Sequence, residues 1–343
     1  PRLRTVQSDG DDAYSFRPAS PPTDFPQAPI VSLETGPLYD AVVVQYTPQH
    51  SLETRLWKAG DARHGADVTP SIGTVDPDTE IVLSLNTDLD NADVVVTEDN
   101  GFESQKRLRN ASLPLAMSSW PAVTGAYLKD DADMLAVVTA QTHAVWAVET
   151  GALHLLLHRR SRAGDVSGAV VLDDTTHHRE TLWVAVGSIL DTNRQRRAAI
   201  PRLASPPLVF AAPCADQRDC APTSKPFSPL KSPFPPNINL VGLSRQDDQV
   251  AFRLQHMYEL GEDPNLSVPV TVDPTALFAP ELSLGTITEK TLTLNNNISD
   301  VHRRPWRSSL LEEPSPALNS NTDSVSGVRI NPLEIRAFTA LVS

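Results

Sequence analysis

Short runs of branched apolar residues, separated by polar or proline-bearing segments, set the pattern of this chain. The clearest alternation lies at residues 249–258, where Val250, Phe252 and Leu254 alternate with small or polar residues. Such alternation places apolar side chains on one face of a strand. No convincing long amphipathic helix accompanies these runs, and strands at this spacing are typical of sandwich folds. The pattern therefore predicts an all-β protein.

The stretch from residue 133 to residue 160 organises the predicted core. It holds two apolar runs of strand length, residues 134–139 and 152–158. In the second run, Leu153, Leu155 and Leu157 share one face. A plausible turn at residues 149–151 precedes it, so we expect a hairpin, or two neighbouring strands, deep in the core.

Proline-rich segments suggest the domain boundaries. The chain has 30 prolines against 15 glycines, and proline breaks helices and removes a backbone donor. We expect an extended or disordered lead-in at 1–35, a central β-sandwich domain at 36–200, a proline-rich linker or long loop at 201–236, and a C-terminal β-sandwich domain at 237–343.

Length and charge exclude some functions. The 343 residues suffice for two or three domains. A net charge of −13 argues against nucleic acid as a partner, and no apolar run is long enough to span a bilayer. Because the chain begins at Pro1, with no methionine and no signal peptide, we expect a processed product or a piece of something longer.

Two adjacent arginines, Arg159 and Arg160, follow the second core strand. Guanidinium groups at a strand end can bind carboxylates or sugar hydroxyls through a rigid fork of donors. The alternative is a solvated strand end that pairs with surface acids.

The histidines show no metal-ligand spacing. On a strand, His177 and His178 would point to opposite faces, while His154 and His158 would share a face roughly 13 Å apart. That distance is too long for one ion. Nucleophile-elbow, phosphate-loop and dinucleotide motifs are also absent from the sequence. We therefore expect neither a metal site nor a catalytic residue in this chain.

The cysteines and the acceptor sequons favour the secretory pathway. Cys214 and Cys220 are the only cysteines, and we expect them to form a disulfide, with two free thiols as the alternative. Sequons occur at Asn110, Asn265 and Asn297.

Several segments, taken in order, resemble the C-terminal half of the α-mannosidases of glycoside hydrolase family 38, and of these the lysosomal type. The order of the segments is specific, although none of them is specific alone. They cover roughly residues 36–343, weakly across 161–236. The segments are residues 97–101 (Thr-Glu-Asp-Asn-Gly) with Lys106 and Arg107, then Trp120, Pro121, Tyr127, Leu128 and Asp130, then 135–139 and 151–160, and in the second block 252–256, 261–263, 265–267, 269–271, 277–278 and 332–338.

The resemblance implies the fold and the activity. It implies an all-β region with a large central β-sandwich, of the supersandwich, galactose-mutarotase-like type, plus a smaller C-terminal β-sandwich. That region would support an N-terminal catalytic barrel that removes terminal α-linked mannose from glycans with retention. The catalytic aspartates and the zinc ligands would lie in that barrel, upstream of this chain. Arg160, with Arg159 second, would contact substrate, and the compartment would be the lysosome or an equivalent.

Two segments depart from the family pattern. After the arginine pair the family has an acidic, glycine-bearing Asp-Asp-x-Arg-Gly loop, whereas this chain has a different sequence at residues 161–168. Between the two core strands the family has a Gln-Gly-rich turn, which residues 141–146 replace here. The alternatives are therefore a non-catalytic protein of degenerate mannosidase ancestry that binds glycans or another protein, and a purely structural scaffold for the barrel. A homo-oligomer is a further open alternative.

Overall fold

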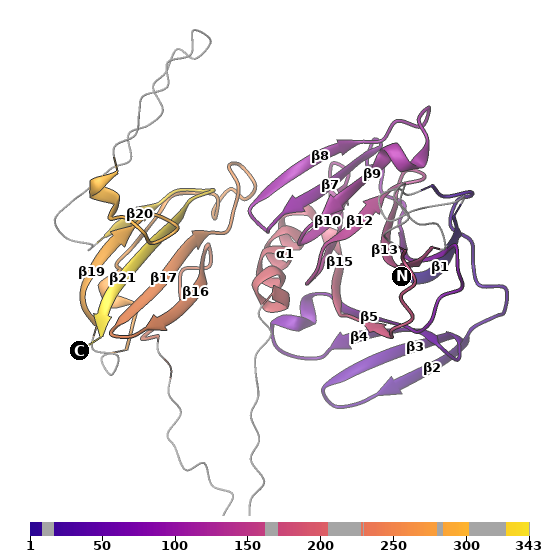
Figure 1. Cartoon of the computed structure of the whole chain (residues 1–343), viewed down its shortest axis with the longest axis horizontal. Coiled ribbons are helices and arrows are strands. Elements are labelled where there is room, and N and C mark those ends of the chain that lie inside the picture. Colours follow the sequence, from indigo (N-terminus) through magenta and orange to yellow (C-terminus); the bar gives the residue numbers. More distant parts are fainter. Residues whose placement is uncertain are drawn as a thin grey trace, which may run out of the picture. The chain divides into compact units, whose positions relative to one another are not determined.

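The chain folds into two compact units, Pro1–Pro207 and Leu208–Ser343. The computed structural model describes residues 1–8, 17–161, 171–204, 228, 230–279, 284–301 and 327–342, with backbone alone at 61, 62, 246 and 342. Both units consist mainly of β-strands (Figure 1). The predicted all-β fold is therefore confirmed.

Two antiparallel sheets form the first unit, as far as the described residues show. The larger sheet has ten strands and the smaller has five. The larger runs in the order β2 (Ile30–Thr35), β3 (Tyr39–Thr47), β4 (His50–Trp57), β5 (Ala66–Ile72), β15 (Leu182–Ser188), β11 (Asp133–Val138), β10 (Gly125–Lys129), β7 (Val94–Asp99) and β8 (Glu103–Leu108), with β14 (His178–Arg179) beside β5. The smaller runs in the order β1 (Arg2–Gln7), β6 (Thr79–Asn86), β13 (Ala152–Arg160), β12 (His143–Trp146) and β9 (Ser119–Ala122).

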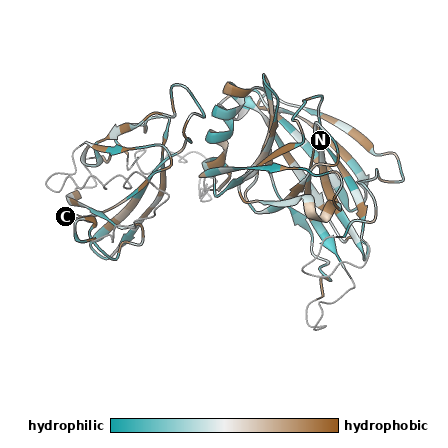
Figure 2. Ribbon diagram, turned by 90° about the horizontal axis from the view of Figure 1, so that it is seen from above, coloured by the Kyte–Doolittle hydropathy of each residue, from teal (hydrophilic) through white to brown (hydrophobic). Residues whose placement is uncertain are grey.

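The main core lies between the facing sides of these sheets. Alternate residues of β6 and β13 are buried against alternate residues of β5, β11 and β15 in one cluster. Leu153, Leu155 and Leu157 all belong to it, which confirms that they share the core face. Hydrophobic and hydrophilic residues accordingly alternate along many strands in Figure 2.

The two central runs do not form the expected hairpin. Residues 134–139 contribute to β11 in the larger sheet, and residues 152–158 lie in β13 in the smaller sheet. The intervening chain contains β12, which takes the place next to β13. The two runs therefore supply opposite layers of the sandwich, because the connection crosses from one sheet to the other.

The turn at Asn100 and Gly101 joins β7 to β8. Both residues have positive φ, 55° and 64°, which asparagine and glycine adopt at little cost. The register pairs Asp99 with Glu103 directly across the turn. The interpretation of Asn-Gly as a hairpin turn is thus confirmed.

The helix α1 (Ile189–Ala204) was not predicted from the sequence. It packs on the outer face of the larger sheet, with Ala199 beside Met134 and Trp183. Its buried face also carries Arg196 and Arg197, which pair with the buried Glu98 of β7. Charged residues on a buried face conceal the helical pattern, and α1 is largely hydrophilic in Figure 2.

Residues 1–35, which we expected to be an extended or disordered lead-in, contain two paired strands among the described residues. β1 pairs along its full length with β6, and β2 pairs with β3. The prolines lie between these strands, so they do not prevent either from forming. Most of the expected linker at 201–236, namely residues 205–227 and 229, lies outside the described residues.

The second unit contains a four-stranded sheet and a two-stranded ribbon among its described residues. Phe252 stacks on Phe338 and meets Phe278 edge-on in its core. The sheet runs β16 (Ile238–Gln246), β17 (Gln249–His256), β21 (Ile335–Val342) and β19 (Leu284–Lys290), and the ribbon pairs β18 (Val270–Val272) with β20 (Val328–Ile330). Short 3-10 helices in the two units are η1 (Asp61–His64), η2 (Leu115–Ser118), η3 (Pro274–Ala276) and η5 (Ile298–Asp300).

Candidate functional site

A β-bulge in β13 decides where the two predicted arginines point. The register with β6 shifts by one residue between Leu156 and His158. Paired residues share a face of the sheet. After the bulge, Arg159 lies opposite Glu80 on the outer face, and Arg160 lies opposite Thr79 on the face towards the larger sheet. The strand therefore separates the two guanidinium groups.

Arg159 is held on the outer face by a buried carboxylate. Its Nε lies 3.2 Å from Oε1 of Glu80, whose side chain is 1 % exposed. A buried charge needs such a partner, because desolvation of an unpaired carboxylate is costly. This contact gives Arg159 a structural task within the sheet.

Arg160 lies at the end of the sandwich, between the two sheets. Its Nε donates to Oδ1 of Asp173 at 2.6 Å, and its NH1 donates to the carbonyl oxygen of Val75 at 3.1 Å. The arginine side chain remains 19 % exposed, and that of Asp173 is 63 % exposed. A guanidinium fixed in this way keeps its charge partly open to solvent.

Residues 162–170, which include most of the loop that departs from the family pattern, lie outside the described residues. The ends of this segment meet, because Ser161 N donates to the carbonyl oxygen of Leu172 at 2.8 Å. The ion pair between Arg160 and Asp173 is adjacent to that contact. The candidate site is thus the sandwich end at which these two residues meet.

A histidine–glutamate cluster lies at the same end of the sandwich. His143 faces acceptors on both ring nitrogens: Nε2 is 3.0 Å from Oε2 of Glu180, and Nδ1 is 2.8 Å from the carbonyl oxygen of Leu156. Two acceptors favour a doubly protonated ring. Burial alone would lower the pKa of His143, but the hydrogen bond and the negative charge of Glu180 outweigh it and raise this pKa.

Glu180 gathers three donors. Gln141 Nε2 donates to it at 2.9 Å, and His178 Nε2 lies 3.2 Å from its Oε1. Burial would raise the pKa of Glu180, but its bonds to His143, Gln141 and His178 lower it. The carboxylate is therefore ionised within the cluster.

His158, placed on the inner side by the bulge, approaches His178 from the opposite sheet, with ring centroids 6.3 Å apart. The pKa of His158 is lowered, mainly by burial and further by the charge of His178, although the nearby Asp174 opposes this shift. His154 lies on the outer face, where its Nδ1 and the Ser84 hydroxyl are 2.8 Å apart. The prediction that His154 and His158 share a face was therefore wrong, because the bulge breaks the alternation.

Sequence reasoning missed this cluster because its members come from distant segments. His143 belongs to β12, His158 to β13 and His178 to β14. No local spacing could have revealed their proximity. The described residues contain no group of three His, Cys, Asp or Glu side chains arranged to hold a metal ion. The resemblance places the zinc ligands upstream of this chain, so that expectation stays a prediction.

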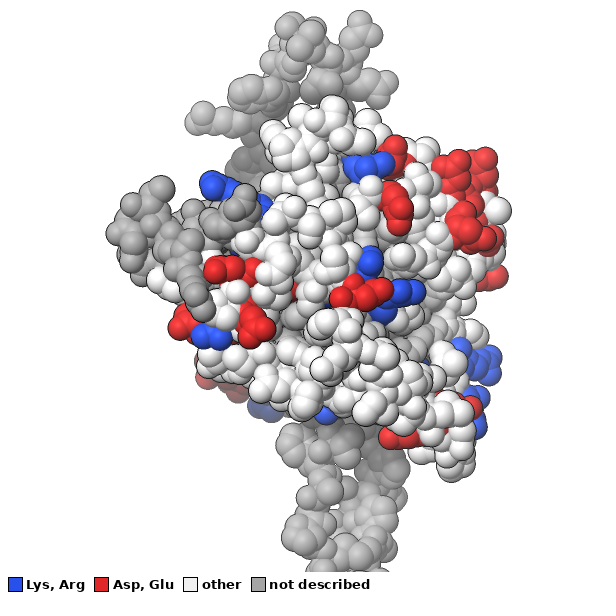
Figure 3. Space-filling model, turned by 90° about the vertical axis from the view of Figure 1, so that its right-hand side faces the viewer, with Lys and Arg blue, Asp and Glu red and all other residues white. Residues whose placement is uncertain are grey.

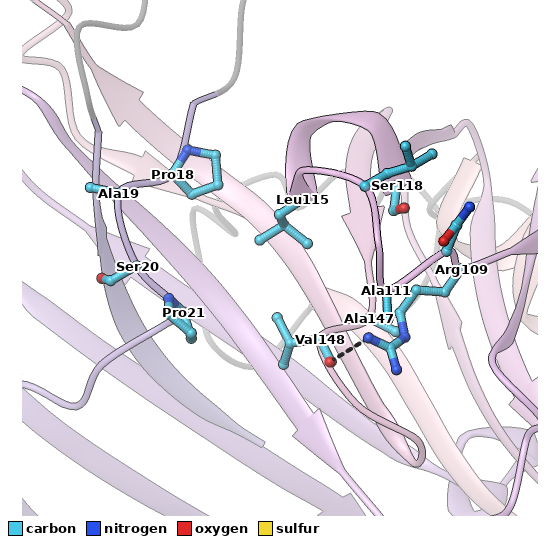
Figure 4. Close-up of a pocket in the computed structure, with 12 residues that line it drawn as sticks. Pro18, Ala19, Ser20, Pro21, Arg109, Ala111, Leu115, Ser118, Ala147 and Val148 are labelled. Carbon is cyan, nitrogen blue, oxygen red and sulfur yellow. Dashed lines mark hydrogen bonds between the residues drawn. The ribbon is translucent and has the colours of Figure 1, made fainter.

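A separate pocket, of about 320 Å³, lies away from the arginine pair, since neither arginine lines it (Figure 4). Pro18 and Pro21 form one side, and Leu115 and Val148 approach from the other. Arg109 borders it and donates to the carbonyl oxygen of Val148 at 2.8 Å.

The three predicted glycosylation sites differ in their surroundings. Asn110, on the rim of that pocket, and Asn265 are exposed, and Asn110 Oδ1 accepts from the Ser112 hydroxyl at 2.7 Å. Asn297 is half-buried and bonds both Lys290 and Asp300 through its amide. Cys214 and Cys220 lie outside the described residues. Among the described helices, none is long and apolar enough to cross a membrane.

Comparison with known proteins identifies relatives for most of the chain. Epididymis-specific alpha-mannosidase of Homo sapiens is 27 % identical over 300 residues, which cover 78 % of this chain and 29 % of that protein. Lysosomal alpha-mannosidase of Cavia porcellus is 30 % identical over 286 residues, covering 77 % and 28 %. That of Mus musculus is 28 % identical over 359 residues, covering 98 % and 35 %. The chain thus spans about a third of the length of these relatives.

The fold has a counterpart among solved structures. The crystal structure of an alpha-mannosidase from Enterococcus faecalis V583 matches with a TM-score of 0.63 and 10 % sequence identity. The match covers 99 % of this chain and 38 % of that one, and it establishes similarity of fold alone. Residues 5–167 match the family model of the glycosyl hydrolases family 38 C-terminal domain. Residues 5–167 are therefore a glycosyl hydrolase family 38 C-terminal domain.

Proposed function

We propose that this chain is the C-terminal part of a retaining α-mannosidase that removes terminal α-linked mannose from glycans. The catalytic aspartates and the zinc would be supplied by an N-terminal barrel outside this chain. The observation that carries the proposal is the family 38 match over residues 5–167, together with α-mannosidase relatives along most of the chain. When bound in the barrel, zinc would polarise sugar hydroxyls as a Lewis acid.

Arg160 is the residue of this chain that we assign to substrate binding. Its guanidinium is oriented by Asp173 and the carbonyl oxygen of Val75, yet remains partly exposed at the sandwich end. Sugar hydroxyls are suitable acceptors for the remaining donors of such a fork. Arg159 pairs with the buried Glu80, so we assign it a structural role in the sheet instead.

The proposal is tested by measuring α-mannosidase activity with and without zinc, on this chain alone and on the chain joined to the region that precedes it in its gene. We expect activity in the joined polypeptide only. Activity in the isolated chain would show that it contains a complete active site. Absence of activity in both the isolated chain and the joined polypeptide would contradict the proposal.

Arg160→Lys tests the role of the arginine in the joined polypeptide. Loss of the planar fork should lower kcat/KM by about tenfold to a hundredfold while leaving the thermal midpoint within a degree or so. Arg159→Lys is the matched control, because it lies one residue away on the opposite face. It should alter the thermal midpoint more than kcat/KM. The reverse pattern would assign the substrate contact to Arg159.

We further propose that the protein works in the lysosome or an equivalent compartment, since two of the relatives above are lysosomal. N-glycans on the exposed Asn110 and Asn265, and a disulfide between Cys214 and Cys220, would fit that route. Peptide mass spectrometry of the protein from its source checks both modifications. Unmodified asparagines and free thiols would contradict this localisation.

A non-catalytic glycan-binding or protein-binding role is the competing function. The departures from the family pattern at residues 141–146 and after Arg160 favour it. Binding of mannosides by a joined polypeptide that lacks activity would support this role. An active joined polypeptide would exclude it.

A further inference from the structure

An apolar stripe continues the core face of the larger sheet beyond the cover of the smaller sheet. In the registers of β2, β3 and β4, the residues that share a face with the core residue Leu52 include Val31, Leu33, Thr35, Asp40, Val42, Val44, Thr54 and Leu56. Burial falls along this face with distance from the core. Leu52 is 1 % exposed, Val42 is 38 %, Leu56 is 56 % and Leu33 is 68 %.

The physical cause is the difference in width between the two sheets. Phe25 and Tyr46 still pack on the core near Leu52. Further towards β2, the high exposure of Val31 and Leu33 shows that the described residues leave this face uncovered, and β2 is an edge strand that pairs with β3 alone. Aliphatic residues on a core-facing side are normally covered, and exposed groups of them mark interaction sites.

The chemistry of the stripe favours a polypeptide as its occupant. Asp40 is the single charged residue on this face of the three strands, and it pairs with Lys58 at 2.9 Å. Figure 3, which views the first unit from the right-hand side of Figure 1, shows charged residues in small groups separated by uncharged surface. A glycan or a nucleic acid would need polar or basic side chains here.

Two observations select which polypeptide. The relatives carry about two thirds of their length outside the part that this chain matches, and the matched domain is their C-terminal one. A second copy of this chain would instead bring together two molecules of net charge −13.

We propose that the inner face of β2, β3 and β4 is the docking surface for the region that precedes this domain in the α-mannosidase polypeptide. This inference rests on the proposed function, and it names the interface through which this chain would support the barrel. The docked region would complete the sandwich core that the smaller sheet leaves open.

The experiment compares Leu33→Lys with Ile30→Lys in the joined polypeptide. The two residues belong to the same strand and are similarly exposed, at 68 % and 74 %. They lie on opposite faces, because their positions differ by an odd number. Leu33→Lys should split thermal unfolding into two transitions and lower mannosidase activity about tenfold or more, by loss of a buried hot-spot contact. Ile30→Lys should do neither.

Hydrogen exchange provides a readout that is independent of activity. In the joined polypeptide, the amides of residues 30–35 should exchange about tenfold or more slowly than in the isolated chain, at every protein concentration. If protection instead grows with the concentration of the isolated chain, the face binds a second copy of this chain, and the proposal is wrong. Equal exchange in both proteins, or equal effects of the two lysine variants, would overturn it. An inactive joined polypeptide with protected residues 30–35 would contradict the proposed function but not the interface.

Discussion

At the residue scale, buried histidines make the first unit sensitive to acid. His154 is 1 % exposed, and burial, with a smaller effect from Arg4, lowers its pKa to about 4. In the unfolded chain a histidine binds its proton near pH 6.5. As the pH falls from 6.5 towards 4, the unfolded state therefore binds more protons, and stability is lost.

His154→Gln should remove that dependence. The variant should be less stable near pH 7, because the imidazole packs against Trp146. Between pH 6.5 and pH 4, its free energy of unfolding should fall less than that of the unsubstituted protein, by on the order of 3 kcal/mol. Denaturant unfolding at both ends of this interval measures the change, and exposed His64→Gln is the control. Equal slopes for the variant and the unsubstituted protein would contradict the assignment.

The ion pair of His143 and Glu180 responds to pH in the opposite direction from His154. The raised pKa of His143 means that its contribution is complete below pH 6.5 and is lost as the pH rises through the folded value. The lowered pKa of Glu180 means that its contribution is present above pH 4.5 and is lost below the folded value. The pair is therefore most stabilising in mildly acid solution.

Glu180→Gln should consequently destabilise the protein most between pH 4.5 and pH 6.5. Breaking one side of a buried pair costs on the order of 3 kcal/mol. Thermal unfolding across this range measures the loss, and Asp174→Asn, on the exposed side of the cluster, is the matched control. A loss that is uniform with pH would indicate a packing effect alone.

At the element scale, a close approach between a turn and a strand restricts one glycine. A Cβ atom added to Gly65 would lie 2.3 Å from Nε1 of Trp183, a ring buried beneath α1. Gly65→Ala should therefore destabilise the first unit by about 1–3 kcal/mol, because the indole must move. In Gly187→Ala, the control, the added atom would lie 3.4 Å from the Thr192 hydroxyl. Denaturant unfolding should separate the two variants, and equal losses would show that the indole moves freely.

Sequence patterns predicted many individual strands but not their partners. Residues 134–139 and 152–158 have the composition of core strands, and both are buried. Their assignment to different sheets depends on β12, a four-residue strand too short to recognise. The helix α1 was missed because Arg196 and Arg197 fill buried positions. Glu98, which forms ion pairs with both of them, is distant in sequence, so no local pattern signals the trio.

At the scale of the whole molecule, the acid response is a balance between these histidines. Burial lowers the pKa of His50, His154 and His158, whereas the contact with Glu180 raises the pKa of His143. The thermal midpoint of the first unit should therefore fall as the pH is lowered from 6.5 to 4.5. Calorimetry measures this directly. A midpoint that rises in this interval would show that the pair of His143 and Glu180 dominates.

The candidate site was predictable in part. The sequence and its resemblance indicated Arg160 with Arg159, but not which arginine would face the space between the sheets. The histidine–glutamate cluster and the open face of β2 to β4 arise from contacts between distant segments. Both required the arrangement of the two sheets, which local periodicity does not encode.

The single extra residue in β13 has a consequence for comparing homologous sequences. Deleting Leu157 would remove the bulge and restore strict alternation, while Arg159 would stay opposite Glu80 and Arg160 opposite Thr79. A relative with the same arginine pair but one residue fewer at the bulge would therefore still present the second arginine between the sheets. An alignment of this segment should therefore match the arginines on the far side of the bulge and place a one-residue gap at Leu157.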